Sequence, residues 1–338
     1  MRRWYAFTRM QKRVARRLPS VLTVSGTSRQ EIIDDLGVRQ DRIHVVHIGA
    51  DTDLFSPDPS VAVVPGRIVT TSSADVPLKG LVFLVEALAK VRAEQPDAHL
   101  VVVGKRPEEG PVAQAMERYG LEGAVEFVKG ISDAELVDLV RSAQAACVPS
   151  LYEGFSLPAA EAMATGTPLV ATTGGAIPEV AGRDGETCLA VPPGESGALA
   201  AALTRLLGDP ELRARLGAAG RERVLRHFTW ARAAEGTVAH YREAMDRAAG
   251  RGDAGGVVRT TAPAPASVSV PRGQAPGGAG DATLDTPADA GAGPVPVNAA
   301  DAPGIPGLSR MSEASEPSAA SDRSDHSDRS DRESRATC

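Results

Sequence analysis

Between residues 66 and 191, short apolar runs alternate with longer segments in which apolar positions recur at helical spacing. The runs predict strands at 67–71, 99–104, 124–128, 145–149, 168–172 and 188–191. Helices are expected over 81–94, 112–119 and 133–143, and from Leu157 onward. Strands that are apolar throughout are typical of a parallel sheet covered by helices on both faces. The pattern predicts an α/β, Rossmann-like domain over 66–226, with ligands bound at the carboxyl ends of its strands.

The segments on either side of this domain are less regular. Residues 1–18 predict a basic amphipathic helix, and residues 20–47 predict a strand, a helix and a strand. A helix of this kind can lie on an anionic membrane surface. Packing against a sheet is the interpretation we favour. Two more helices are expected over 210–225 and 229–246.

The last part of the chain has a different composition. No aromatic residue follows Tyr241, and residues 250–307 consist mainly of Ala, Gly, Pro, Asp and Val. Such a segment buries too little apolar surface to offset its chain entropy, so residues 248–338 are predicted to be disordered. A Ser-Asp-Arg repeat near the end keeps the tail solvated. A spacer is favoured over a phosphorylatable interaction tail.

Charge and cysteine content narrow the function classes. The formal net charge is −6, and the three cysteines show neither metal-binding spacing nor a disulfide framework. No run is long or apolar enough to span a bilayer or to serve as a signal peptide. We therefore expect a cytoplasmic enzyme, possible peripheral contact with the inner face of the membrane through residues 1–18, and no nucleic-acid partner.

Two carboxylates flank the start of the helix at Leu157, in the stretch Glu153-Gly-Phe-Ser-Leu-Pro-Ala-Ala-Glu161. Pro158 fits the first helical turn, where its missing N–H costs nothing. The preceding strand and loop direct backbone N–H groups and the positive end of the helix dipole at whatever lies above the sheet. A diphosphate between two hydroxyl-rich rings would suit this spacing.

This stretch and its neighbours resemble the family-4 (group 1) retaining glycosyltransferases, two-domain enzymes of the GT-B fold marked by two Glu residues with seven between them. The supporting stretches are Pro149-Ser-Leu-Tyr-Glu-Gly-Phe155, Glu161-Ala-Met-Ala-Thr-Gly-Thr-Pro168, Gly174-Gly-Ala-Ile-Pro-Glu179 and Gly185-Glu-Thr-Cys-Leu-Ala-Val-Pro192. The resemblance implies that residues 66–226 are a nucleotide-sugar-binding domain. It assigns the donor sugar to Glu153, Gly154, Phe155 and Ser156, a diphosphate contact to the Leu157 backbone, and the ribose to Glu161.

The same resemblance assigns Lys79 and Gly80, which precede a helix, to the donor diphosphate. A lysine at a helix start is unfavourable unless an anion is present. The family places an Arg six residues before this Lys, but the position here is Ser73. Either Ser72 and Ser73 bind phosphate, or Lys105 and Arg106, after the next strand, supply the missing charge. The nucleotide base is expected near Val128, Gly130 and Ile131, where main-chain groups can read its edge.

The first 56 residues resemble only the closing part of the family's N-terminal acceptor domain, followed by a linker at 57–65. We therefore expect most of that domain to be missing from this chain. Neither His44 nor His47 matches the family's His near the transferred sugar, so the catalytic residues stay unknown. Residues 227–247 resemble the family's crossover helix, so Trp230 and Tyr241 are expected to pack either on the N-terminal domain or within their own domain.

The sequence thus predicts a retaining glycosyltransferase that moves a hexose from a nucleotide-diphosphate sugar to a lipid, saccharide or small-molecule acceptor. No metal or cofactor is expected. The alternative is a nucleotide-sugar-binding subunit, inactive alone, that acts with a separate acceptor-domain chain. A degenerate regulatory module is a third and weaker hypothesis.

Overall fold

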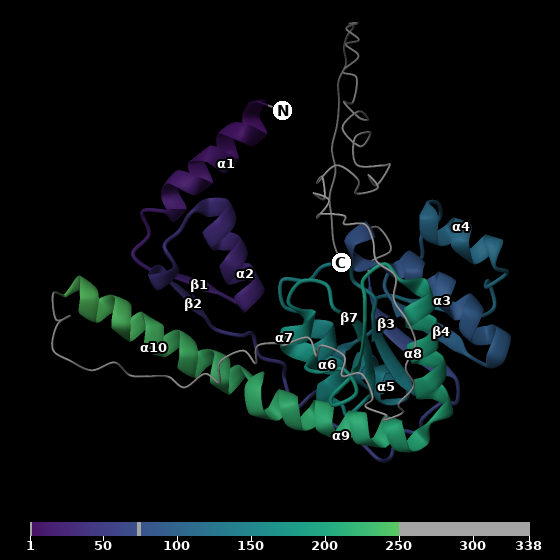
Figure 1. Cartoon of the computed structure of the whole chain (residues 1–338). Helices are drawn as coiled ribbons and strands as arrows, with labels where there is room; N and C mark the ends of the chain where they lie inside the picture. Colours follow the sequence, from purple (N-terminus) through teal and green to yellow (C-terminus); the bar gives the residue numbers. More distant parts are fainter. Residues whose placement is uncertain (1, 73–75, 250–338) are drawn as a thin grey trace, which may run out of the picture. The chain divides into compact units, whose positions relative to one another are not determined.

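The computed structural model describes residues 2–72 and 76–249. These residues lie within one compact unit, Met1–Val258 (Figure 1). The predictions for Ser73 and for residues 250–338 of the tail fall outside the described residues.

A six-stranded sheet forms the centre of the domain. Its strands are β3 (Arg67–Thr71), β4 (His99–Val103), β5 (Val125–Val128), β6 (Ala145–Val148), β7 (Leu169–Thr172) and β8 (Leu189–Val191). The spatial order is β5-β4-β3-β6-β7-β8, and every neighbouring pair is parallel. The six predicted strands are confirmed to within one residue at each end. The direction of strand progression reverses between β3 and β6.

Side chains alternate between the two faces of the sheet, as a strand requires. On β3, Ile68 packs into one hydrophobic cluster and Val69 into the other. On β6, Cys147 joins the first cluster and Val148 the second. Burial raises the pKa of the Cys147 thiol far above its ordinary value, so Cys147 behaves as a small apolar residue. The continuous apolar runs in the sequence reflect burial on both faces.

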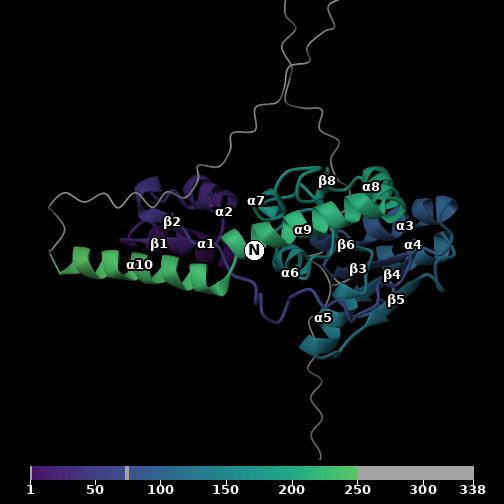
Figure 2. The same cartoon turned by 90° about the horizontal axis from the view of Figure 1, so that it is seen from below.

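Helices cover both faces of the sheet (Figure 2). One cluster contains side chains of α3 (Leu81–Glu94), α4 (Pro111–Arg118) and α8 (Ser196–Gly208). The other contains side chains of α5 (Asp133–Arg141), α6 (Leu157–Ala164) and α7 (Ile177–Ala181). The helix α9 (Pro210–His227) contributes Leu216 to the first and Val224 to the second. The predicted three-layer arrangement is confirmed.

Two helices of the domain were not predicted, α7 and α8. The sequence of α8, Ser-Gly-Ala-Leu-Ala-Ala-Ala-Leu-Thr-Arg-Leu-Leu-Gly, has small apolar residues around most of the helix. The polar face of this helix is therefore too narrow for the apolar and polar positions in the sequence to show a clear helical period. Leu199, Leu203 and Leu206 of α8 are fully buried, so tertiary packing defines this helix.

The first residues form a small separate sheet. The strands β1 (Val21–Thr23) and β2 (Ile43–Val45) pair in parallel, and α1 (Arg2–Ala15) and α2 (Gly26–Glu31) accompany them. A π-helical turn at Ile32–Leu36 and a 3₁₀ turn at Gln40–Arg42 complete the connection. The expectation that the apolar stripe of the first helix packs against a sheet is wrong for the described side chains. Met10 and Val14 are 51% and 52% exposed.

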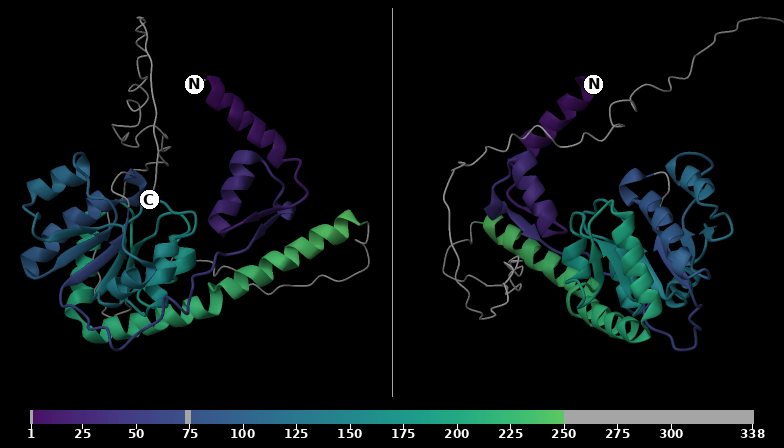
Figure 3. Two further views of the ribbon diagram at one scale, coloured as in Figure 1. Left: turned by 180° about the vertical axis from the view of Figure 1, so that it is seen from behind. Right: turned by 45° about the vertical axis from the view of Figure 1, so that its right-hand side comes forward.

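The last described helix, α10 (Trp230–Ala248), follows α9 after a break at Phe228 and Thr229 (Figure 3). Phe228 is buried in the domain, and its carbonyl accepts a hydrogen bond from the amide of Ala50 at 2.9 Å. The expectation that Trp230 and Tyr241 pack is wrong, because their side chains are 55% and 62% exposed. None of the helices described is long and apolar enough to cross a membrane.

Gly217 provides a test of the packing between α9 and the end of α6. A Cβ at this position would lie 2.2 Å from the carbonyl oxygen of Gly166. Alanine in place of glycine ordinarily stabilises a helix by about 1 kcal/mol. Here we expect Gly217→Ala to destabilise the domain by about 1–3 kcal/mol, because the clash is with backbone.

The matched control is Gly197→Ala in α8, where the nearest atom to the new Cβ is Lys90 Nζ at 3.7 Å. Urea unfolding should show a lower stability for Gly217→Ala and an unchanged or higher stability for Gly197→Ala. Equal stabilisation in both variants would contradict the tight contact between α9 and Gly166.

Candidate functional site

The reversal of strand order between β3 and β6 fixes the location of the site. The chain leaves β3 and β6 toward opposite faces of the sheet, and ligands of such sheets bind above the carboxyl ends of the strands at this point. After β3 the chain passes through a 3₁₀ turn at Pro77–Lys79 before α3 begins. After β6 it forms the loop 149–156 before α6 begins. Lys79, Gly80, Glu153 and Ser156 therefore all lie at one switch point.

The two loops are joined by backbone contacts. The amide of Leu151 donates a hydrogen bond to the carbonyl of Leu78 at 2.8 Å. Gly80 has φ +67°, and a Cβ there would lie 2.0 Å from the carbonyl oxygen of Pro149. Only glycine satisfies both the left-handed conformation and this close approach. The role of Gly80 seen in the structure is therefore to bring Lys79 against the second loop.

Lys79 and Glu153 form an ion pair across the switch point, with Lys79 Nζ 2.7 Å from Glu153 Oε1. Ser150 Oγ donates a second hydrogen bond to the same carboxylate oxygen, also at 2.7 Å. The Glu153 side chain is 13% exposed and that of Lys79 is 33% exposed. In the structure the anion beside Lys79 is the carboxylate of Glu153, and the contact of Lys79 with a diphosphate stays a prediction.

The start of α6 presents unpaired hydrogen-bonding groups. Ser156 has φ 102° and ψ 74°, and it alone among the described residues other than glycine has a positive φ. Its hydroxyl is buried and has no hydrogen-bond partner among residues 2–72 and 76–249. In the described part of the chain, the amides of Leu157 and Ala159 likewise donate no hydrogen bond. A strained residue with free donors at a helix N-terminus is typical of an anion site.

The neighbouring residues of this loop have different surroundings. Phe155 is buried, and its ring lies 5.7 Å from that of Phe228 and 6.2 Å from that of His47. Its side chain therefore anchors the loop, which leaves its backbone available to a ligand. Gly154 follows Glu153 directly, and its carbonyl accepts a hydrogen bond from Ser28 Oγ at 3.4 Å.

Glu161 lies one turn into α6, as the sequence predicts. Burial, together with the negative charge of Asp133, raises the pKa of its carboxyl to about 7. No partner for this carboxyl is found among the described residues. Asp133 begins α5, directly after the loop that contains Gly130 and Ile131. The predicted ribose residue Glu161 thus interacts electrostatically with Asp133, which follows the predicted base residues in the sequence.

The remaining predicted residues lie at the ends of β4 and β5. Val128 ends β5, and Gly130 has φ +68° in the loop that follows. Lys105 follows β4 and lines a cavity of about 1160 Å³ together with Arg106, Phe127 and Lys129. The structure does not bring Lys105 into contact with Lys79 or Glu153. Lys105 follows a strand directly in the sequence, but this position does not bring it to the β3–β6 switch point.

Residues of the small N-terminal sheet also contact this region. Glu179 accepts hydrogen bonds from the amides of Gly26 and Thr27 at 2.7 and 2.8 Å, and from Thr27 Oγ1 at 2.7 Å. Burial opposes ionisation of Glu179, but these bonds and His47, 3.8 Å away, outweigh it and lower the pKa to about 2. Tyr152 donates to the carboxylate of Glu31 at 2.6 Å.

No role for Glu179, Thr27 or Tyr152 was predicted. Glu179 lies in the Gly174–Glu179 stretch that carries the family resemblance. That resemblance is the sequence feature that could have indicated a role for Glu179. Its partners lie about 150 positions earlier in the chain and cannot be found from local spacing. These contacts hold the start of α2 against Glu179 of α7 and its end against the loop residue Tyr152.

The described residues offer one group of potential metal ligands, His44, His240 and Glu243. None of these three belongs to the switch-point loops. Lys79, Ser156 and the free amides of α6 suit an anionic ligand instead.

Comparison with known proteins shows which proteins this domain is similar to. Residues 58–223 match the model of the family described as glycosyl transferases group 1. Solved glycosyltransferases share its α/β architecture, so the fold is that of the GT-B transferases.

Individual relatives agree with this assignment. The chain is 47% identical over 249 residues to an MMP alpha-(1->4)-mannosyltransferase of Mycolicibacterium hassiacum, covering 74% of this chain and 60% of the relative. It is 37% identical over 213 residues to a phosphatidyl-myo-inositol mannosyltransferase of Mycobacterium leprae, covering 62% of this chain and 55% of the relative. The chain therefore spans little more than half the length of these curated relatives.

Two solved structures are similar to this chain in fold. Sucrose-phosphate synthase from Thermosynechococcus elongatus is 28% identical with a TM-score of 0.62, covering 72% of this chain and 62% of that one. Anabaena HepE in complex with UDP and glucose is 24% identical with a TM-score of 0.62, covering 70% and 66%. Because HepE is only 24% identical to this chain, the similarity shows a shared fold and nothing about function.

The raised pKa of Glu161 predicts a pH-dependent effect on stability. An unfolded glutamate titrates near pH 4.3. Because the folded-state pKa is about 7, the charged carboxylate opposes folding fully above pH 7, and this penalty disappears as the pH falls toward 4.3. We expect Glu161→Gln to raise the melting temperature at about pH 8 and to change it much less at about pH 5.

The matched control is Glu126→Gln, an exposed glutamate on β5. Thermal melts of both variants should show a pH-dependent gain for Glu161→Gln only. An equal shift at both pH values would show that the Glu161 carboxyl is not desolvated in the folded chain.

Proposed function

We propose that this chain transfers a hexose, with retention of configuration, from a nucleotide-diphosphate sugar to a lipid, saccharide or small-molecule acceptor. The observation that carries the proposal is the Lys79–Glu153 pair, together with the free donors of Ser156 and Leu157 in the loop that follows Glu153. A cation, a carboxylate and unpaired amides at one switch point suit a ligand that combines anionic and hydroxyl groups.

Each part of the donor is proposed to have its own contacts. The hexose would contact Glu153, Gly154, Phe155 and Ser156, and the ribose would contact Glu161. The base would lie near Val128, Gly130 and Ile131. The diphosphate would contact the side chain of Lys79 and the backbone of Gly80 and Leu157, with Ser73 and Lys105 as further candidates.

The ion pair suggests how binding would proceed. An incoming diphosphate competes with Glu153 for Lys79, because both are anions that the ammonium group can pair with. Once Lys79 turns to the phosphate, the Glu153 carboxylate becomes free to accept hydrogen bonds from sugar hydroxyls. The pair would thus keep both groups ordered before the donor arrives, which reduces the entropic cost of binding.

Charge development on the leaving diphosphate determines what the protein must stabilise. Lys79 and the N-terminal amides of α6 would bind that charge as the bond to the hexose breaks. The departing diphosphate would then accept the proton of the acceptor hydroxyl. The proposal includes no metal and no cofactor, and it assigns no catalytic histidine.

The relatives narrow the substrates to be tested. Two of them carry the name mannosyltransferase, and others are named D-inositol 3-phosphate glycosyltransferase. Mannose is therefore the first hexose to test, and acceptors should include saccharides and inositol-containing compounds.

The direct test is nucleotide-diphosphate release from UDP-, GDP- and ADP-hexoses, with and without these acceptors. Acceptor-dependent release with one donor is the expected result. Binding of a nucleotide diphosphate without turnover by the chain alone would favour the second candidate, a donor-binding subunit that acts with a separate acceptor-domain chain. Absence of binding to every nucleotide diphosphate would overturn both.

Lys79 and Lys105 can be distinguished by substitution. We expect Lys79→Ala to weaken binding of the preferred nucleotide diphosphate by about 10- to 100-fold, since it removes a charge-assisted hydrogen bond. Lys105→Ala should weaken it by less than about threefold, as expected for a more distant and solvated charge.

Isothermal titration calorimetry measures both affinities, and circular dichroism checks that each variant is folded. Equal losses in the two variants would contradict the assignment of the diphosphate to the β3–β6 switch point.

A further inference from the structure

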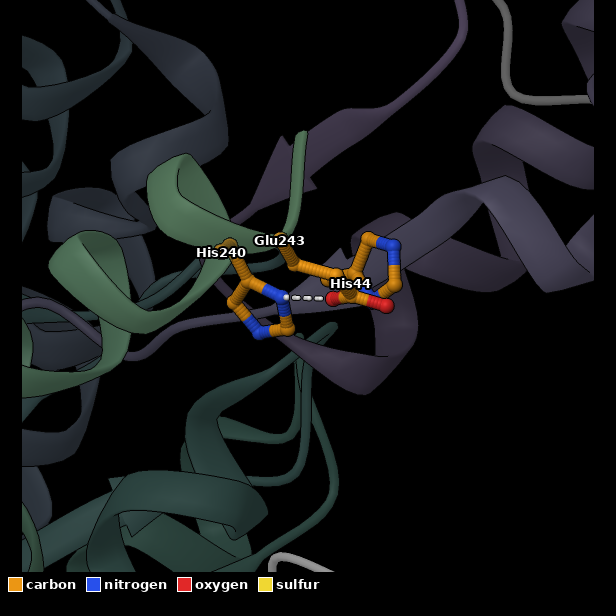
Figure 4. Close-up of side chains that lie close together, drawn as sticks. All are labelled: His44, His240 and Glu243. Carbon is orange, nitrogen blue, oxygen red and sulfur yellow. Dashed lines mark hydrogen bonds and ion pairs between the residues drawn. The ribbon is translucent and has the colours of Figure 1, made fainter. Parts of the chain in front are cut away.

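A second polar cluster lies outside the switch-point loops. It consists of His44 on β2 and of His240 and Glu243 on α10 (Figure 4). One potential ligand atom from each side chain lies within 4.8 Å of the others. The two imidazole rings are 4.3 Å apart between centroids. Residues far apart in the sequence thus converge on one small volume.

His44 has a buried polar atom without a hydrogen-bond partner in the described part of the chain. Its Nε2 atom has no hydrogen-bond partner among the described residues. A buried nitrogen without a partner costs free energy, so its presence calls for an explanation. Burial and the neighbouring His240 also lower the pKa of His44. An imidazole nitrogen without a hydrogen-bond partner can serve as a metal ligand.

Glu243 is already oriented toward the two histidines. Its Oε2 atom lies 3.4 Å from His240 Nδ1. Its Oε1 atom is paired with Arg247. Such a second contact fixes the orientation of a ligating carboxylate, as outer-shell partners commonly do at metal sites. One carboxylate oxygen therefore faces the imidazoles and the other is held in place.

We propose that His44, His240 and Glu243 bind one divalent transition-metal ion, with Zn²⁺ as the ion of choice. Two imidazoles and one carboxylate are a donor set that Zn²⁺ accepts, with water as the fourth ligand. Metal–ligand bonds of about 2 Å require ligand atoms about 3.3 Å apart, so the side chains must move together by about 1–2 Å. Partly exposed side chains can make this adjustment.

The positive charges near the cluster limit its affinity. Arg29 and Arg247 both act electrostatically on His44. They disfavour a bound cation, whereas Glu243 favours it. We therefore expect affinity weaker than that of a closed structural site with four protein ligands.

A bound metal ion would fasten α10 to the β1–β2 sheet. From Trp230 to Arg247 no described side chain of α10 is buried. Val238, Tyr241 and Met245 are 43%, 62% and 69% exposed. The nearby packing contacts include Gly236 against Val46. Because α10 has so little buried surface, one bound metal ion would have a large effect on its docking. At a free metal concentration 100 times the dissociation constant, binding would shift the docking equilibrium by about 100-fold.

The test uses the full chain after removal of metals with a chelator. Zn²⁺ binding is measured by calorimetry, Co²⁺ coordination by visible absorption, and docking of α10 by amide hydrogen exchange over residues 230–247. We expect one saturable site, tetrahedral Co²⁺ bands, and slower exchange in α10 with Zn²⁺. His44→Ala and His240→Ala should each weaken Zn²⁺ binding by at least about tenfold.

His99→Ala serves as the matched control, because His99 begins β4 outside the cluster. It should bind Zn²⁺ as the unmodified chain does. Should His44→Ala misfold, His240→Ala on the exposed helix decides the question alone. Absence of saturable binding, or equal binding in His240→Ala and the unmodified chain, would overturn the proposal.

Discussion

The reversal of strand order between β3 and β6 is the constraint on which the rest of the site depends. In a parallel sheet, the chain crosses over one face of the sheet after each strand. Neighbouring strands send the chain to opposite faces only where the strand order reverses. The two loops that leave this point carry the lysine, the carboxylate and the helix start. Their positions follow from sheet topology, because each strand is fixed by burial on both faces.

Local strain then sharpens the site. Gly80 accepts a left-handed conformation at no cost, but Ser156 does so against the preference of a residue with a Cβ. The cost, about 1–2 kcal/mol for such a conformation, is offset by the burial of Phe155 and by the hydrophobic packing of α6. This conformation leaves the Ser156 hydroxyl and two amides at the start of α6 unpaired at the switch point. Lys79 and Glu153 neutralise each other there, which allows both charges to stay partly buried.

The N-terminal residues are attached to this site through polar contacts. Glu179 binds the first two amides of α2, and Tyr152 binds Glu31 at the other end of the same helix. These bonds link a small two-stranded sheet to the loops that adjoin Glu153. A shift of α2 would therefore change the surroundings of the proposed donor sugar. Hydrogen bonds to charged groups suit such a contact, because they are strong when formed and can exchange with water.

The sequence by itself determined the parallel sheet, its six strands and the helix start at Leu157, because these depend on local periodicity and on strands buried on both faces. Motif spacing and the family resemblance also predicted Lys79, Glu153 and Glu161 as site residues, and the structure places Lys79 beside Glu153. The sequence did not identify α8, whose small residues give no amphipathic period, or the exposure of Trp230 and Tyr241. The pairing of Lys79 with Glu153, the anchoring of α2 by Glu179 and the meeting of His44 with His240 were decided by tertiary structure alone. Each joins residues more than 70 positions apart, and local pattern carries no information about which distant side chains the folded sheet brings together.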